Sequence, residues 1–143
     1  MSFIKVSVQI VTFNSAAVIG ECIDSLWLQT TKDFRVRIFD NASSDKTLEL
    51  IEDLDLDLII STSNKGFGAG HNRLLSRYPA PYVLFLNPDT VLEPNFIECL
   101  TNALEEDENA GSATGKLLRM DGKTIDNLGQ KVVDAITFGS NYM

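Results

Sequence analysis

Two polar side chains separated by a proline follow a short apolar run in the middle of the chain. The run Tyr82–Leu86 has the composition of a buried strand, and Asn87-Pro88-Asp89-Thr90 comes directly after it. Pro88 has no N–H to donate to a sheet ladder, so we expect the strand to end before it. A carboxylate such as Asp89 at that place, beside other oxygen ligands, suits a hard cation such as Mg²⁺ or Mn²⁺. The simpler interpretation is a turn with a capping aspartate.

Three further polar or glycine-rich groups also follow expected strands. They are Thr12-Phe13-Asn14, Asp40-Asn41 and the stretch from Asn64 to Asn72. The last of these contains three glycines at every second position, Gly66, Gly68 and Gly70, and glycine lets a backbone approach a ligand closely. Ligands of open α/β sheets bind just outside the carboxyl ends of the strands. The four groups therefore predict one site at one sheet edge, across which a nucleotide could lie.

The elements that would position these groups alternate between strand and helix. Periodicity and turn residues predict strands over 5–12, 34–39, 56–61, 82–86 and 111–118, and helices from 18 to about 29–32, 47–54, 74–78 and 94–104. Asn14 or Ser15 can cap the first helix and Ser44 or Asp45 the second, while Met120–Lys123 is typical of a hairpin turn. This alternation predicts a three-layer α/β domain around a mostly parallel sheet.

Composition limits the function classes. The chain has 143 residues, enough for one core, and its net charge of −8 argues against non-specific nucleic-acid binding. No apolar run is long enough to cross a bilayer and no signal pattern opens the chain, so we expect a soluble cytoplasmic protein, with peripheral membrane contact still compatible. Cys22 and Cys99 lie in helical apolar patterns, which predicts two buried free thiols.

Other nucleotide-binding α/β proteins fit less well. A dinucleotide-binding dehydrogenase needs its glycine-rich turn after the first strand, where this chain has Thr-Phe-Asn-Ser-Ala-Ala. The Gly-x-x-x-x-Gly-Lys-Ser/Thr pattern of a P-loop is absent from the sequence. A receiver-type phosphoacceptor domain would leave the glycine-rich stretch without a role.

The four groups together resemble the motifs of family 2 glycosyltransferases with a GT-A fold. The matching segments are Val11–Asn14, Asp40–Asp45, Asn64–Asn72 and Leu86–Thr90, in family order and each at an expected strand end. The resemblance covers residues 1–118, as a nucleotide-sugar-binding GT-A half. It implies an incomplete fold, in which 119–143 form a hairpin and a tail leading towards an acceptor-binding half.

The resemblance also implies roles for individual residues. Asp40 would accept a hydrogen bond from a pyrimidine N–H, and Asp89 would bind the Mg²⁺ or Mn²⁺ that bridges the donor diphosphate. Asn87 departs from the family's Asp-x-Asp motif and would contact ribose or sugar instead. The expected nucleotide-binding residues are Thr12, Phe13, Asn14, Asp40, Asn41, Asn64, Gly66, Gly68, Gly70, His71, Asn72, Asn87 and Pro88. His71 and Asp40 also have ordinary structural interpretations, and capping alone would explain Asp45.

The implied reaction is displacement at the anomeric carbon of a nucleotide-diphosphate sugar by a hydroxyl of a saccharide or lipid-linked acceptor. Inverting members use a carboxylate as general base. No residue after Asp89 stands in a matching motif, so no base is assigned, and we expect the chain to be the donor-binding part only. Polysaccharide synthesis at the bacterial cell surface is the commonest setting of the family.

The tail gives a finer expectation about the donor. Thr124–Gly129 resembles the segment that leads into the acceptor half of rhamnosyltransferase-like members, which favours deoxythymidine-diphosphate-rhamnose over UDP-sugars. The alternatives are a non-catalytic nucleotide-sugar-binding module and, less favoured, a sugar nucleotidyltransferase, which would need a glycine-rich basic loop after the first strand. An uncovered apolar surface would lead to self-association or to a disordered tail after about Leu118.

Overall fold

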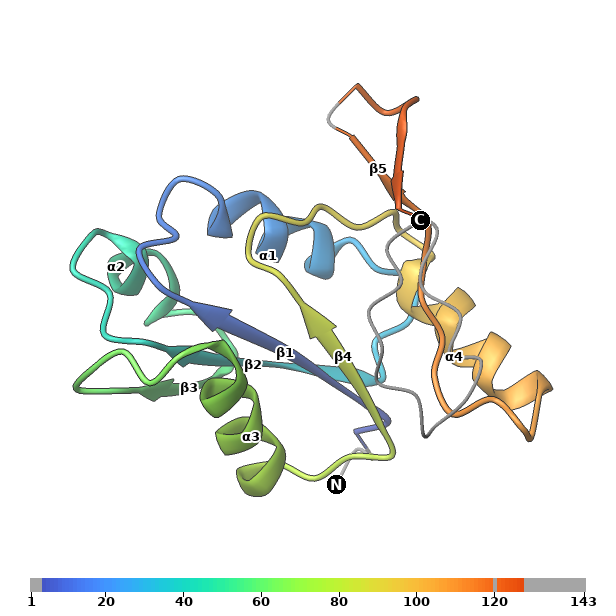
Figure 1. The fold of residues 1–143 in the computed structure, drawn as a ribbon, viewed down its shortest axis with the longest axis horizontal. Coiled ribbons are helices and arrows are strands. Elements are labelled where there is room, and N and C mark those ends of the chain that lie inside the picture. The colour runs from blue at the N-terminus through green and yellow to red at the C-terminus, as the bar shows by residue number, and fades with distance from the viewer. Residues whose placement is uncertain (1–3, 120, 128–143) are drawn as a thin grey trace, which may run out of the picture. The chain divides into compact units, whose positions relative to one another are not determined.

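Four parallel strands form the centre of the fold. The computed structural model describes residues 4–119 and 121–127, and everything below refers to these. The strands are β1 (Val6–Thr12), β2 (Phe34–Asp40), β3 (Asp57–Ile60) and β4 (Tyr82–Leu86), in the spatial order β3-β2-β1-β4 (Figure 1). Val6 of β1 pairs with Phe34 of β2 and with Tyr82 of β4. The strands begin and end within one residue of their expected bounds, because β-branched runs end at polar turn residues.

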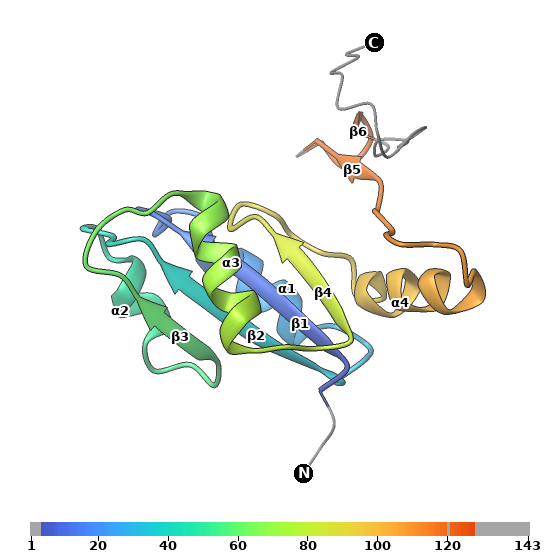
Figure 2. The same ribbon diagram turned by 60° about the horizontal axis from the view of Figure 1, so that its bottom comes forward.

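Helices lie on both faces of this sheet. They are α1 (Ile19–Trp27), α2 (Thr47–Ile51), α3 (Phe67–Arg77) and α4 (Phe96–Glu106). One face of β1 packs with buried residues of α1, α2 and the first turn of α4, among them Ile19, Ile51 and Ile97. The other face is covered by α3 (Figure 2). Leu74 of α3 packs there with Val11 and Phe39. The expected three-layer α/β/α arrangement is confirmed for this part of the chain.

The bounds of all four helices differ from expectation: α1 ends at Trp27, before the expected 29–32, and α4 spans Phe96–Glu106 where 94–104 was expected. The third helix begins at Phe67 and not at Leu74, so Gly68 and Gly70 lie within it. Glycine has low helix propensity, but tertiary packing overrides that preference here. The second helix ends at Ile51, and its chain continues as a turn through Leu54.

A second unit of the chain begins at Asn102, after the unit that ends at Thr101. The expected fifth strand over 111–118 is wrong for most of its length, since only Leu117–Leu118 (β5) is a strand, and it pairs antiparallel with β6 (Ile125–Asn127). The hairpin itself is confirmed. Oδ1 of Asp121 accepts the N–H groups of Lys123 and Thr124, both at 2.8 Å, which explains the turn. The expected tail beyond Asn127 lies outside the described residues.

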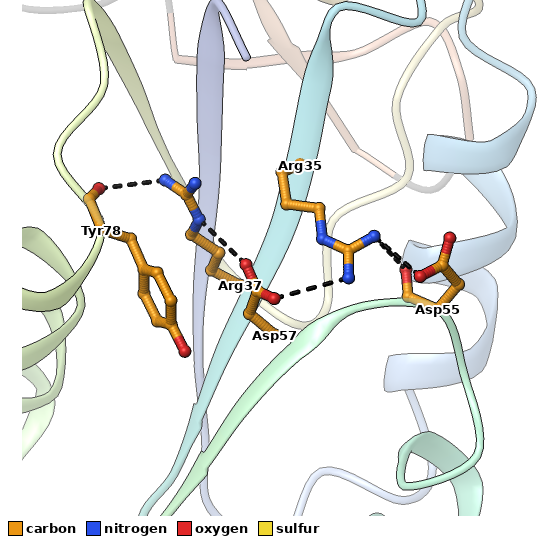
Figure 3. Close-up of polar contacts among 5 residues, drawn as sticks. All are labelled: Arg35, Arg37, Asp55, Asp57 and Tyr78. Atoms are coloured by element: carbon orange, nitrogen blue, oxygen red, sulfur yellow. Dashed lines mark hydrogen bonds and ion pairs between the residues drawn. The ribbon is translucent and has the colours of Figure 1, made fainter. Parts of the chain in front are cut away.

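An ion-pair network connects the C-terminal end of α3 to the sheet (Figure 3). Arg37 of β2 is 7% exposed, donates from Nη1 to the carbonyl of Tyr78 at 3.0 Å, and pairs with Asp57 at 3.3 Å. Its guanidinium also lies 4.8 Å from the centre of the Tyr78 ring. Arg35 extends the network outward to Asp57 and Asp55. The last turn of a helix leaves carbonyls without partners, so Arg37 acts as a cap supplied by the sheet.

Candidate functional site

The predicted site residues follow the carboxyl ends of the four parallel strands. Thr12 ends β1, Asp40 ends β2, and Asn87 follows Leu86 at the end of β4. Thr12 and Asp40 are directly paired in the register of β1 and β2. Because all four strands run the same way, these ends meet at one edge of the sheet, as predicted.

Asp40 is buried and already hydrogen-bonded. It is 0% exposed, and its Oδ1 accepts the hydroxyls of Thr12 at 2.9 Å and Ser43 at 2.6 Å, while Oδ2 accepts the Ser43 N–H at 2.9 Å. A carboxylate keeps further lone pairs, so another donor could bind in principle. Because Asp40 is fully buried, a nucleobase N–H would reach it only if residues around it moved. The expected contact with a pyrimidine stays a prediction.

The loops after β1 and β2 are tied together by Asn14. Its Oδ1 accepts the N–H groups of Ser44 at 2.8 Å and Asp45 at 3.3 Å, and its own N–H donates to the hydroxyl of Ser43. Asn14 has φ 50° and Ala42 has φ 63°, both in the left-handed region. Asparagine tolerates that region and alanine does so at a cost, so backbone strain is stored at this edge. Neither Asn14 nor Ser15 caps α1 with its side chain.

Asp45 serves the local fold in the way that capping predicts. Its carboxylate accepts the N–H of Thr47 at 2.9 Å and of Ala16 at 3.0 Å. The hydrogen bonds with Thr47 are the main cause that lowers the pKa of Asp45. Asn41 has a comparable task, because its side chain accepts the N–H of Lys65 at 2.8 Å and donates to the carbonyl of Gly66 at 3.1 Å. Asn41 is 2% exposed and positions the glycine-rich stretch.

The three glycines of that stretch are not equivalent. Gly66 has φ 88° and precedes α3, where a side chain would be strained. A Cβ on Gly70 would lie 2.8 Å from Cγ2 of Val11 and 2.9 Å from Cδ1 of Phe39, so this glycine is needed for helix-to-sheet packing. A Cβ on Gly68 would meet nothing within 4 Å. The folded chain therefore does not itself require Gly68, which leaves close approach of a ligand as an explanation.

Two polar residues of α3 point in different ways. His71 is 4% exposed and lies between the rings of Phe67 and Phe85, at centroid distances of 4.4 and 4.9 Å. Its Nδ1 lies 3.4 Å from Oε1 of Gln9, and burial lowers its pKa. His71 therefore has the structural interpretation that a lone histidine suggested. Asn64 and Asn72 are exposed, and Oδ1 of Asn64 already accepts the N–H of Gly66 at 2.9 Å.

The turn after β4 presents Asp89 to solvent. The N–H of Thr90 donates to the carbonyl of Asn87 at 3.2 Å, which places Pro88 at the second position of the turn, where its fixed φ is favoured. Asn87 and Asp89 are exposed. Beneath them, the buried Sγ of Cys22 lies 3.7 Å from the carbonyl of Asn87, and burial raises the pKa of this thiol to about 12. The expectation of two buried thiols is wrong for Cys99, which is exposed on α4.

Asp89 suits a cation that takes most of its ligands from the substrate and from water. Within 4–119 and 121–127, no group of three or more His, Cys, Asp and Glu side chains could hold a metal ion. An exposed carboxylate on a rigid turn suits Mg²⁺ or Mn²⁺, which protein carboxylates bind singly or in pairs when substrate phosphates complete the shell.

Sequence reasoning missed the residues that support this edge. Ser43 supports Asp40, and Ser25 and Gln29 bond to the segment that follows Asp89. Ser43 lies inside the segment Asp40–Asp45, so its position in that motif could have indicated a role at the site. Ser25 and Gln29 gave no such signal, because polar residues near a helix end are ordinarily exposed.

Comparison with known proteins identifies the family of this chain. Residues 7–140 match the family described as Glycosyl transferase family 2. The chain belongs to this family. It is 34% identical over 128 residues to a chondroitin synthase of Pasteurella multocida, a match that covers 85% of this chain and 13% of that protein. It is 32% identical over 109 residues to a cholesterol galactosyltransferase of Borreliella burgdorferi, covering 73% and 30%. The chain thus spans less than a third of the length of either relative.

Solved structures agree with the family 2 assignment. The chain superimposes on S. aureus TarS 1–349 in complex with UDP-GlcNAc with a TM-score of 0.67 and 28% identity, covering 73% of this chain and 32% of that one. A mannosyltransferase of Pyrobaculum calidifontis in complex with GDP-Man and Mn²⁺ gives a TM-score of 0.53 and 27% identity, covering 61% and 28%. The expected GT-A fold is confirmed. Within the described residues, no helix is both long and apolar enough to cross a membrane.

Proposed function

We propose that this chain is the donor-binding part of a glycosyltransferase, which moves a sugar from a nucleotide diphosphate to a saccharide or lipid-linked acceptor. The observation that carries the proposal is the family 2 match over a chain whose four predicted groups gather at one sheet edge. Exposed Asn64, Asn72 and Asn87, with the bare backbone at Gly68, form the surface on which the donor would lie.

Among donors, we favour a uridine-diphosphate sugar. The solved structures of S. aureus TarS 1–349 in complex with UDP and with UDP-GlcNAc are similar to this chain over 73% of its length. Deoxythymidine-diphosphate-rhamnose, suggested by the tail, differs from a UDP-sugar at the base and at the 2′ position of the pentose. A titration with both diphosphates separates the two donors.

Asp89 is the proposed protein ligand of Mg²⁺ or Mn²⁺ at the donor diphosphate. The bound metal would act as a Lewis acid that stabilises the departing diphosphate. The turn closed between Asn87 and Thr90 would hold the Asp89 carboxylate at the edge, and Asn87 would bond to ribose or sugar. The transfer is expected to invert the configuration at the anomeric carbon. None of the described residues is assigned as its general base.

Calorimetric titration of the chain with UDP and dTDP, each with and without Mn²⁺, tests this function. We expect metal-dependent binding that favours UDP and is lost in Asp89→Ala, because the carboxylate is removed and the turn is kept. The matched control is Asp53→Ala, which removes an exposed carboxylate after α2 and should bind as the wild type does. Equal affinity of Asp89→Ala and wild type in Mn²⁺ would exclude Asp89 as the ligand.

Transfer itself needs a separate assay. A binding module without catalysis would give the same titration, so any longer product of the same gene is assayed for release of UDP in the presence of acceptor. Turnover supports the transferase, whereas tight donor binding without turnover favours the module.

A further inference from the structure

A row of buried polar side chains on α1 and just after its end holds the segment that follows Asp89. Cys22, Ser25 and Gln29 are 1%, 4% and 1% exposed, although each carries a polar atom. Cys22 and Ser25 lie three residues apart on one stripe of α1, and Gln29, two residues after the end of the helix, extends this stripe. The stripe faces the segment from Asn87 to Ile97, which carries no strand and becomes helical only at Phe96.

Each side chain of the stripe bonds to backbone groups of that segment. Sγ of Cys22 donates to the carbonyl of Asn87, and Oγ of Ser25 accepts the N–H of Leu92 at 3.1 Å. Nε2 of Gln29 donates to the carbonyl of Glu93 at 2.8 Å. Oε1 of Gln29 accepts the N–H of Ile97 at 3.0 Å. The stripe therefore replaces the partners that a sheet or helix would have given this backbone.

The chemistry of the partners explains why residue 29 is a glutamine. Nε2 also donates to the carbonyl of Ser25 at 3.2 Å, so the amide donates twice and accepts once. A carboxylate of the same shape accepts but does not donate, and an aliphatic side chain does neither. Removing either partner of a buried backbone group leaves that group unsatisfied, at a cost of about 1–3 kcal/mol.

We infer that Ser25 and Gln29 are positioning residues for the Asn87–Asp89 turn. Both are buried, and they act by fixing the backbone at Leu92, three residues after Asp89, and at Glu93 and Ile97 beyond it. Without them the Asp89 carboxylate would no longer be held at the sheet edge. This inference rests on the proposed function, in which that carboxylate binds the metal.

The first test measures the turn without any ligand. Amide hydrogen exchange by NMR is followed at Thr90, whose N–H closes the turn, in wild type, Ser25→Ala and Gln29→Met. Relative to the slowest amides of β1, we expect exchange at Thr90 to rise at least about tenfold in both variants, as the loss of a buried hydrogen-bond partner implies. Ser25→Thr keeps the hydroxyl and should restore protection.

Arg37→Met is the matched control, since it removes a buried polar side chain of β2 that bonds to Asp57 and Tyr78 and not to the segment after Asp89. It should lower global stability and leave the relative exchange at Thr90 unchanged. Unchanged relative exchange at Thr90 in both Ser25→Ala and Gln29→Met overturns the inference. If either variant does not fold, Gln29→Glu, which keeps the acceptor for Ile97, takes its place with the same expectation.

The second test connects the turn to the donor site. The gain in UDP affinity on adding Mn²⁺ is measured for the same variants, and we expect it to fall about tenfold in Ser25→Ala and Gln29→Met but not in Arg37→Met, as one lost buried hydrogen bond implies. Wild type without a metal-dependent gain defeats the proposed function. A normal gain in wild type that persists in both variants defeats the positioning role alone.

Discussion

At the residue scale, the three glycines at the start of α3 show that the same residue type can be required for different reasons. Gly66 is needed for its positive φ and Gly70 for its contact with the sheet, while Gly68 is needed for neither. The pattern of three glycines is visible in the sequence. Which of them the fold requires depends on Val11 and Phe39, far away in the chain, so sequence alone could not sort them.

The pair Gly68→Ala and Gly70→Ala tests this distinction. Gly70→Ala should lower the free energy of unfolding by about 1–3 kcal/mol, because its methyl group overlaps packed side chains. Gly68→Ala should keep or raise stability by up to about 1 kcal/mol, because alanine favours the helix. Urea denaturation measures both. Equal destabilisation by the two substitutions would contradict the assignment of Gly70 alone to packing.

Gly68→Ala should nevertheless weaken UDP binding if the donor passes over the bare backbone of α3. The same sample serves for calorimetry, so a loss of affinity in a fully stable variant would be a direct effect on the site. Unchanged affinity would mean that the donor does not approach Gly68 closely.

His71 gives the chain a pH-dependent stability that can be isolated, since it is the single histidine. Burial lowers its pKa below the ordinary 6.5, so the unfolded state binds the proton more readily than the folded state. Stability is therefore full above pH 6.5 and is lost as the pH falls through that value, by at most about 1.4 kcal/mol per pH unit. Its neighbours Phe67, Phe85 and Gln9 carry no titratable group.

Urea denaturation between pH 8 and pH 5 measures this dependence, in a range chosen around the ordinary histidine pKa of about 6.5. His71→Gln should lack the part of the decline that wild type shows below that value, while the part caused by carboxylates stays the same in both. Parallel curves for the two proteins would mean that His71 is protonated as easily in the folded state as in the unfolded state.

At the element scale, strands were more predictable than helix ends and loop supports. The bounds of β1 to β4 follow from apolar runs and the turn residues after them, which are local signals. The start of α3 and the short β5 depend on contacts across the fold. The predicted groups of the site were recognised because they carry unusual residue types, whereas Ser25 and Gln29 gain their meaning only from partners in the segment after Asp89.

The ion-pair network beside α3 predicts unequal costs for two neighbouring arginines. Arg37→Ala should lower the free energy of unfolding by about 1.5–3 kcal/mol, because the Tyr78 carbonyl loses a buried donor. Arg35→Ala should cost less than about 1 kcal/mol, because Asp55 is 91% exposed and solvent screens the pair. Thermal and urea unfolding of both variants measures the difference, and equal costs would show that Tyr78 finds another donor.

At the scale of the whole molecule, the chain leaves apolar surface exposed around β4. Phe67 and Phe85 are 56% and 55% exposed, and within the described residues β4 pairs with β1 on one side and with no strand on the other. Unpaired strand edges and apolar patches favour association.

We predict that this chain of 143 residues self-associates reversibly, as sedimentation velocity over a concentration series would show. Phe85→Lys should weaken the association. Leu28→Lys removes a side chain that is 71% exposed just after α1, and it should leave the association unchanged. Sedimentation as a monomer at every concentration would contradict the prediction.

The pairing of β1 also determines when the sheet can form during synthesis. β1 is central, yet its partner β4 is made after α1, β2, α2, β3 and α3. Until Tyr82–Leu86 has left the ribosome, β1 has one open edge, and the polar stripe of α1 has no backbone to bond. Pairings between distant segments slow folding and prolong exposure to aggregation. The site at the carboxyl ends of the strands, which includes Asp89, would thus form late, when β4 pairs with β1 in the nascent chain.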